Sequence, residues 1–164
     1  MILRPTNNYG KNQYPEKFIP LVVKLLKEGK KIRLHDNGNP IRNWLHVKDT
    51  SRAIKFLLEK NVKNDIIHIA GPSEHKNIDV AKAIVLQFAY NSQSNDWECI
   101  KKFWKNQMLD EEGYFDLSYV RPGQDVRYSL NDGKLKSMGF ELKHIDFLSE
   151  LRTLVKHYSE EFRW

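Results

Sequence analysis

The sequence predicts an α/β fold, and three observations support this. Short apolar runs that are typical of strands alternate with longer stretches whose apolar residues recur at helical spacing. Turn residues, mainly Gly, Asn, Asp and Pro, separate these segments. The composition, 40% hydrophobic and 29% charged over 164 residues, is that of an ordinary globular protein with one core. We therefore expect residues 1–164 to form a single domain.

The first segments are predicted to be a strand, a loop and a helix. Residues 1–5 look like the end of a strand, and residues 7–15 are rich in turn residues. A helix is expected over 15–30, because Pro15 suits its first turn and Gly29 suits its C-terminal cap. The apolar face of this helix contains Phe18, Leu21, Val22, Leu25 and Leu26.

The next segments predict a hairpin and a second helix. Residues 31–47, KIRLHDNGNPIRNWLHV, read as two short strands joined at the Gly-containing turn DNGN. The helix that follows covers residues 50–60, and either Asp49 or Thr50 can cap its first turn.

The rest of the chain continues the alternation except in residues 91–120, a variable segment without a clear period. No internal repeat is present. The remaining predicted elements are a strand at 65–71, a helix at 77–90, a strand at 125–130, a short helix at 131–140 and a long helix at 145–162.

Composition argues against several function classes. The net charge of +6 comes from scattered lysines and arginines without a nucleic-acid motif, so we expect no nucleic-acid partner. No apolar stretch is long enough to span a bilayer, no secretory signal is visible, and Cys99 is alone, so we expect a cytoplasmic protein away from membranes. The six histidines lack the spacing of a metal site, and we predict none.

The polar loop before the first helix suggests a binding role. Asn7 and Asn8 carry amides that donate and accept, and Tyr9 offers a rigid ring with a polar tip. The helix entry that follows carries Lys17, and free N–H groups at a helix entry can bind an anion. The alternative is an ordinary turn whose Asn side chains bond their own backbone while Lys17 faces water.

Arginines elsewhere add to the case for an anion site. Arg42 stands on a predicted strand, where a guanidinium can grip a phosphate with two donors. Arg121, Gly123 and Arg127 surround a Pro-Gly turn. Each arginine taken alone is more often a surface residue or an ion-pair partner.

Together these segments resemble one family. The runs NNYGKNQYPEKFIP, IRNWLHVKDTSRAI, KNIDVAKAI and RPGQDVRYSLNDGKLKSMGF are similar, in order and spacing, to the C-terminal half of dTDP-glucose 4,6-dehydratases. These enzymes belong to the extended short-chain dehydrogenase/reductases, in the NAD-dependent epimerase/dehydratase family. The resemblance implies the C-terminal, substrate-binding part of an extended Rossmann-type dehydratase, without the N-terminal dinucleotide-binding half.

The resemblance also assigns binding roles. It places Asn8 at the nicotinamide side of NAD. It places a larger set of residues at a nucleoside diphosphate sugar. His68 stands where the family usually has an Asn. The implied sugar-nucleotide contacts are Asn7, Lys17, Phe18, Ile19, Pro20, Leu21, Val22, Arg33, Leu34, His35, Arg42, His68, Arg121, Pro122, Gly123, Gln124, Arg127 and Tyr128.

The residues that carry the family's chemistry are not found. The sequence has no Gly-rich dinucleotide turn, and none of its seven tyrosines is followed four positions later by a lysine. We therefore expect no catalytic residue, no NAD bound by this chain alone and no activity by itself. Three hypotheses stay open: a shortened dehydratase, one chain of a split dehydratase or epimerase, and a non-enzymatic binding domain. We also expect the chain to hide exposed sheet edges and apolar faces by self-association or by a rearranged sheet. The expected partner is a further copy of the chain or a separate Rossmann half.

Overall fold

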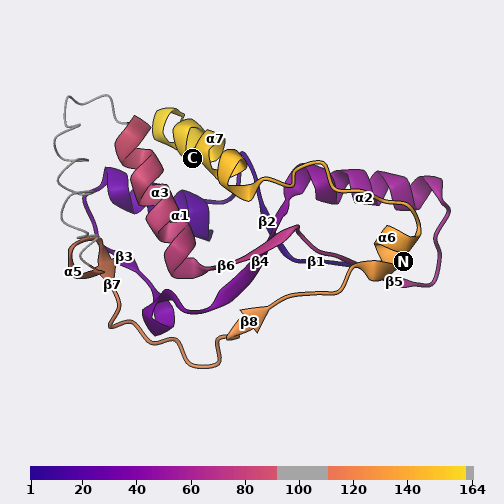
Figure 1. The fold of residues 1–164 in the computed structure, drawn as a ribbon, viewed down its shortest axis with the longest axis horizontal. Helices are drawn as coiled ribbons and strands as arrows, with labels where there is room; N and C mark the ends of the chain where they lie inside the picture. Colours follow the sequence, from indigo (N-terminus) through magenta and orange to yellow (C-terminus); the bar gives the residue numbers. More distant parts are fainter. Residues whose placement is uncertain (92–110, 162–164) are drawn as a thin grey trace. The chain divides into compact units, whose positions relative to one another are not determined.

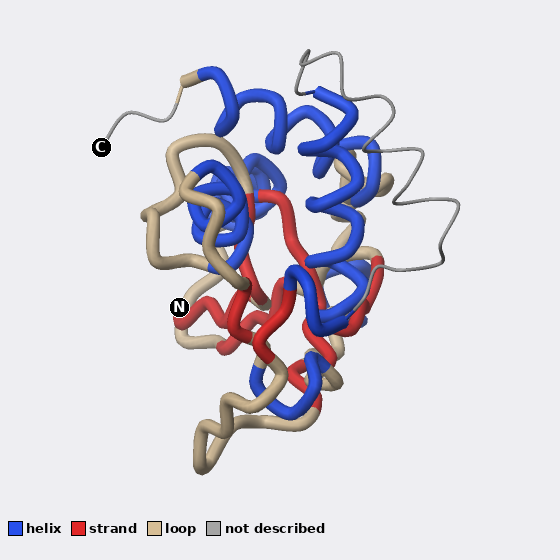
Figure 2. The backbone as a smooth tube through the Cα atoms, turned by 90° about the vertical axis from the view of Figure 1, so that its left-hand side faces the viewer, coloured by secondary structure: helices blue, strands red, loops and turns tan. Residues whose placement is uncertain are grey.

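The structure is a computed structural model that describes residues 1–91 and 111–161, and these residues form two compact units that interleave along the chain (Figure 1). Figure 2 shows the helices in blue and the strands in red. Unit 1 contains Met1–Gly10, Ile41–His75 and Asp125–Phe147. Unit 2 contains the described residues of Lys11–Pro40, Lys76–Gln124 and Leu148–Trp164. We expected one domain. The chain crosses between the units five times, which explains why no boundary is visible in the sequence.

Unit 1 is built on two small sheets. Strand β1 (Ile2–Pro5) pairs in parallel with β5 (Ile66–Ile69), and Ile2 lies opposite Ile66 in the register. A four-stranded sheet has the order β2-β4-β6, with β8 also paired to β4. Its strands are β2 (Asn7–Tyr9), β4 (Ile41–His46), β6 (Ser73–Lys76) and β8 (Arg127–Tyr128).

Two helices cover one face of the β1–β5 pair. Helix α2 (Val47–Glu59) and the short helix α6 (Gly133–Ser137) pack their apolar residues against Ile67 and Ile69, and Leu3 joins them. The alternation of a strand explains this, because residues 3, 67 and 69 point to one face while Ile2 and Ile66 point to the other. The buried cluster contains Leu45, Ala53, Leu57, Ile67, Ile69, Leu135 and Phe140.

Unit 2 is mainly helical. Helix α1 (Phe18–Lys27) packs against α3 (Asn77–Asn91), and most of α7 (Phe147–Glu160) also lies in this unit. A parallel pair joins β3 (Ile32–Arg33) to β7 (Phe115–Asp116), which follows the one-turn helix α5 (Glu111–Tyr114). The buried apolar side chains of the unit include Ile19, Val22, Val23, Ile32, Leu34, Val80, Ala81, Ile84, Val85, Phe115, Leu151, Leu154, Val155 and Tyr158.

The predicted hairpin at residues 31–47 is wrong. Its first strand, β3, pairs with β7, whereas its second strand, β4, pairs with β2 and β8. The residues between them form a one-turn 3-10 helix, η1 (His35–Gly38), in which Asp36, Asn37 and Gly38 have φ values of +48°, +53° and +73°. Three successive residues with positive φ turn the chain from one unit into the other, which a two-residue hairpin turn would not do.

Other local predictions are partly corrected. Helix α2 is capped by His46, whose Nδ1 accepts a hydrogen bond from the Lys48 backbone N–H at 3.2 Å, and not by Asp49 or Thr50. The polar loop at 7–15 begins as strand β2, and β6 was not expected. The predicted helix after residue 15 is confirmed as α1, with Gly29 at φ +63° beyond its end. Part of the variable segment, residues 92–110, lies outside the described residues.

Candidate functional site

The main candidate site is a pocket inside unit 2 with a volume of about 470 Å³. One wall is a partly buried side of α1, where Phe18, Leu21, Val22 and Leu25 follow helical spacing. Three of these residues were assigned to the ligand by the resemblance, and Leu25 was not. The wall can take a flat apolar group such as the face of a base.

The opposite wall of the pocket is polar and mainly basic. Lys30, Lys31, Ile32 and Arg33 come from the end of the α1–β3 connection and from β3. Glu28 forms an ion pair with Lys30 at 2.8 Å, and both side chains are exposed. The three cations suit a ligand that carries negative charge next to an apolar group.

Strand pairing brings Asp116 into the same pocket. In the β3–β7 register Asp116 lies opposite Arg33, and the Leu34 backbone N–H donates to the Asp116 carbonyl at 3.0 Å. The Arg33 Nε lies 3.7 Å from the Asp116 Oδ2. The Ser118 hydroxyl donates to the Asp116 Oδ1 at 2.6 Å, and the Ser118 backbone N–H donates to it at 3.1 Å. These bonds, the hydroxyl bond first, lower the pKa of Asp116, so the carboxylate is charged near neutral pH.

The RPGQ turn also lies in unit 2 and meets another predicted residue. The Arg121 backbone N–H donates to the His35 Nδ1 at 2.5 Å, across 86 positions of sequence. Gly123 has φ +73°, which supports the predicted turn from Arg121 through Pro122 to Gln124. The structure therefore brings His35 and the turn together within one unit.

In unit 1, the two asparagines of the opening loop have different surroundings. Asn7 is half-buried on β2 and lies opposite Trp44 in the register. The Asn8 amide donates to the Thr6 carbonyl at 3.0 Å, and its oxygen accepts from the Thr50 hydroxyl at 2.5 Å. The Asn8 bond to Thr6 is the local side-chain-to-backbone contact that we kept as the alternative to a binding role.

Arg42 has a structural role that the sequence did not reveal. Its guanidinium is nearly buried, with 9% exposure, and donates to the carbonyls of Ile41 at 2.8 Å and Asp125 at 2.9 Å. These bonds tie β4 to the segment that enters β8. A guanidinium has five N–H donors, so this role leaves donors for a further acceptor.

Arg127 and Tyr128 form β8, beside β4. Arg127 makes a two-pronged ion pair with Glu74 of β6, at 2.7 and 2.9 Å, and the Ser129 hydroxyl donates to the same carboxylate at 2.5 Å. The Arg127 bond is the main reason that the pKa of Glu74 is lowered, and Ser129 adds to it. Arg127 is thus an ion-pair partner within unit 1, as the sequence alternative allowed. His68 lies on β5, opposite Arg4.

Sequence reasoning missed a buried polar network in unit 1. Thr6 donates to the Asn43 Oδ1 at 2.7 Å, and the same oxygen accepts from the Gly71 N–H at 2.6 Å. The Asn43 amide donates to the carbonyls of Gly71 at 3.0 Å and Ser73 at 3.3 Å. Asn43 therefore joins three strand ends. A polar amide directly before the apolar pair Trp44 and Leu45 of β4 is the signal that could have identified it.

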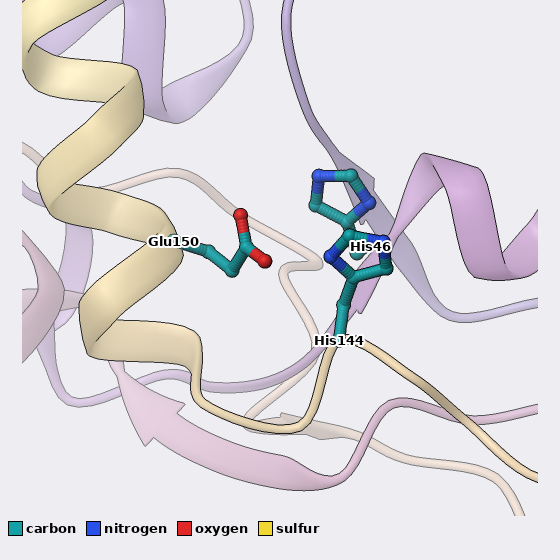
Figure 3. A group of neighbouring side chains, drawn as sticks. All are labelled: His46, His144 and Glu150. Carbon is teal, nitrogen blue, oxygen red and sulfur yellow. The ribbon is translucent and has the colours of Figure 1, made fainter.

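Two histidines of unit 1 also lie together. The rings of His46 and His144 stack with centroids 3.9 Å apart and planes 16° from parallel (Figure 3). His46 is buried and its Nδ1 caps α2, so this ring is held from two sides. Glu150, also drawn in Figure 3, belongs to unit 2. The absence of a metal site stays a prediction.

The architecture is that of part of a Rossmann-type α/β dehydratase. A dTDP-glucose 4,6-dehydratase from Bacillus anthracis, solved in complex with NAD, superposes on 97% of this chain with a TM-score of 0.75 at 31% identity, and 44% of that chain is covered. The Streptomyces venezuelae dTDP-glucose 4,6-dehydratase, solved with NAD and TYD bound, gives a TM-score of 0.76 at 31% identity over 98% of this chain and 44% of its own. The predicted α/β fold class is confirmed.

Sequence comparison gives the same result. The dTDP-glucose 4,6-dehydratase of Streptomyces niveus is 32% identical over the full length of this chain, which covers 43% of that relative. The NAD dependent epimerase/dehydratase family matches residues 1–70. The predicted resemblance to dTDP-glucose 4,6-dehydratases of this family is therefore confirmed. The chain spans less than half the length of these relatives.

Proposed function

We propose that the chain binds a nucleoside diphosphate sugar, as the substrate-binding part of an NAD-dependent dTDP-glucose 4,6-dehydratase. The observation that carries this proposal is the unit 2 pocket, which combines the apolar side of α1 with three cations. A nucleoside diphosphate has the matching composition, a flat base joined to a dianionic or trianionic tail. The relatives support it, because a Streptomyces venezuelae dehydratase was solved with NAD and TYD bound.

The proposal includes no catalytic step for this chain alone. A dinucleotide site of this class needs a Gly-rich turn through which backbone N–H groups reach the pyrophosphate, and the sequence has none. Asn8, the residue assigned to NAD by resemblance, has its amide bonded to Thr6 and Thr50. The residues present thus do not make a complete NAD site. We infer that NAD binding and dehydration require a Rossmann half from elsewhere.

An open sheet face supports the need for a partner. Parallel sheets are stable mainly when both faces are covered, but Ile2 and Ile66, paired in the β1–β5 register, are 56% and 44% exposed. We propose that self-association or a Rossmann half covers them. Analytical ultracentrifugation over a wide concentration range, with and without a separately expressed Rossmann half, tests this. A monomer under all these conditions contradicts it.

The cytoplasmic location stays a prediction. No helix among residues 1–91 and 111–161 is long and apolar enough to cross a membrane.

Calorimetric titration with thymidine diphosphate and with its glucose ester tests the binding proposal. Leu21→Glu places a carboxylate in the apolar wall and should abolish binding, because it opposes both apolar contact and ligand charge. Leu148→Glu is the matched control, since Leu148 is 58% exposed in unit 2 and does not line the pocket. Equal affinity of the two variants, or no binding by the unaltered chain, would contradict the proposal.

A further inference from the structure

The unit 2 pocket contains one carboxylate among its three cations, and this carboxylate is held in a fixed orientation. The Asp116 Oδ1 accepts both bonds from Ser118, so this oxygen is occupied. Within the described residues, no hydrogen bond reaches the Asp116 Oδ2: the Arg33 Nε lies 3.7 Å away, which is too long for one, and Lys31 acts on the carboxylate through its charge. Asp116 and Arg33 both line the pocket. The Oδ2 atom is therefore an acceptor that is available to a ligand.

We propose that Asp116 is a specificity-determining residue that accepts a hydrogen bond from an N–H or O–H donor of the nucleoside. This inference rests on the proposed function and adds the chemistry of one contact to it. A charged acceptor in a site selects strongly for a ligand that carries a donor, because a ligand without one leaves the carboxylate desolvated and unpaired. The same charge repels phosphate, so Asp116 also directs the anionic tail away from itself.

Because the bonds from Ser118 fix the orientation of the Asp116 side chain, Asp116→Asn has a defined effect on the atom that faces the ligand. In Asp116→Asn the Ser118 backbone N–H can only donate, so the amide oxygen must take the place of Oδ1. The amide NH₂ then stands at the place of Oδ2. The variant has nearly the same size, but it offers a donor where the unaltered protein offers an acceptor.

Glu28→Gln is the matched control. Glu28 forms an ion pair with Lys30, a lining residue, but does not itself line the pocket. Both variants remove one negative charge beside a lining cation, Lys30 in the case of Glu28 and Arg33 in the case of Asp116. Only Asp116→Asn removes the acceptor from the pocket.

The experiment is calorimetric titration of the full chain with thymidine diphosphate and with pyrophosphate. Asp116→Asn should weaken thymidine diphosphate binding by about tenfold or more, as expected for a hydrogen bond to a charged group. It should leave pyrophosphate binding equal or tighter, because a repulsive charge is gone. Glu28→Gln should weaken neither ligand. A loss of thymidine diphosphate binding without a loss of pyrophosphate binding could not come from misfolding, which would weaken both.

Ligand analogues identify the donor on the unaltered protein. If the donor is the ring N–H of the base, N3-methylthymidine diphosphate should bind about tenfold more weakly. If it is the ribose hydroxyl, 3′-deoxythymidine diphosphate should show the loss. Full affinity of both analogues, or of Asp116→Asn for thymidine diphosphate, overturns the role of Asp116 while the binding proposal stands. No binding of thymidine diphosphate by the unaltered chain overturns both.

Discussion

The buried carboxylate of Asp49 accepts a hydrogen bond from the backbone N–H of His144 at 2.8 Å, across 95 positions of sequence. The Lys143 backbone N–H donates to the same carboxylate, and Arg52, one turn along α2, forms an ion pair with it. Asp49 has no measurable exposure. One side chain at the start of α2 thus fixes the segment that leads to α7, and it leaves the cap of α2 to His46.

Replacement of Asp49 should strongly reduce the free energy of unfolding. Asp49→Ala leaves two backbone N–H groups and the Arg52 guanidinium without their acceptor, and the expected loss is about 3 kcal/mol in the free energy of unfolding. Asp49→Asn keeps the shape and one acceptor, so its loss should be smaller. Urea denaturation followed by circular dichroism measures both. An alanine variant as stable as the unaltered chain would show that the network contributes nothing.

The same residue predicts a pH dependence. Burial raises the pKa of Asp49, but the bonds from His144, Lys143 and Arg52 outweigh burial, so its net pKa is lowered. A lowered pKa in the folded state means that the stabilisation is complete above the pKa of the unfolded chain, about 3.9. It is lost as the pH falls from there through the folded value. The stability difference between the unaltered chain and Asp49→Asn should therefore be constant from pH 7 to about pH 5 and shrink below about pH 4. A constant difference down to pH 2 would contradict this.

Gly71 should tolerate no side chain. A Cβ at this position would lie 1.7 Å from the Trp44 carbonyl oxygen, which belongs to the backbone of β4 and cannot rotate away. We expect Gly71→Ala to cost about 3 kcal/mol of stability, since strand and turn must separate to admit the methyl group. Gly29→Ala is the control. Gly29 has φ +63°, but nothing lies within 4 Å of a Cβ at this position, so the expected loss of stability is only about 1 kcal/mol. Thermal unfolding should rank the two variants in this order, and the reverse order would refute the steric explanation.

The ion pair between Arg127 and Glu74 should matter little for stability. The Arg127 side chain is 61% exposed, and solvent screens a pair of this kind. Glu74→Gln should leave the unfolding midpoint in urea almost unchanged. If Arg127 also contacts a ligand, the same variant should strengthen thymidine diphosphate binding, because it removes a competing anion. A large fall in the midpoint would mean that the pair supports the sheet.

Substitutions of Arg42 and Arg121 should differ in their effects on ligand affinity and on stability. Arg121 is an exposed turn residue, so Arg121→Ala should weaken thymidine diphosphate binding by about 1.5 to 3 kcal/mol without a change in stability. Arg42→Ala should lower both, because the carbonyls of Ile41 and Asp125 lose their donor. Titration and urea denaturation of the two variants test this together. Unchanged affinity in either variant would remove that arginine from the set of ligand contacts.

Much of the fold was predictable because it depends on local pattern. The helical spacing of Phe18, Leu21, Val22 and Leu25 predicted α1, and the same spacing now forms a wall of the pocket. Helices α2, α3, α6 and α7 and strand β5 were expected close to their places. The hairpin failed because strand partners are chosen by long-range packing, and β3 found Phe115 and Asp116 more than 80 positions away.

The candidate site was predictable only in part for the same reason. Resemblance assigned Phe18, Leu21, Val22 and Arg33, which the pocket brings together, but it said nothing of Lys31 or Asp116. It also gave Arg42 and Arg127 as ligand contacts, whereas the structure shows what else holds them: backbone carbonyls for one and Glu74 for the other. Such partners come from distant segments, and their identity is absent from any local motif.

The sequence by itself determined the α/β class, most helices and the resemblance to part of a 4,6-dehydratase, because apolar periodicity and motif order are properties of the chain. Only the tertiary structure decided which residues face one another: Asp49 with His144, Arg33 with Asp116, and Asn43 with Gly71. The physical reason is that buried polar groups must find hydrogen-bond partners, and the folded backbone, which here crosses repeatedly between two units, determines which partners are within reach.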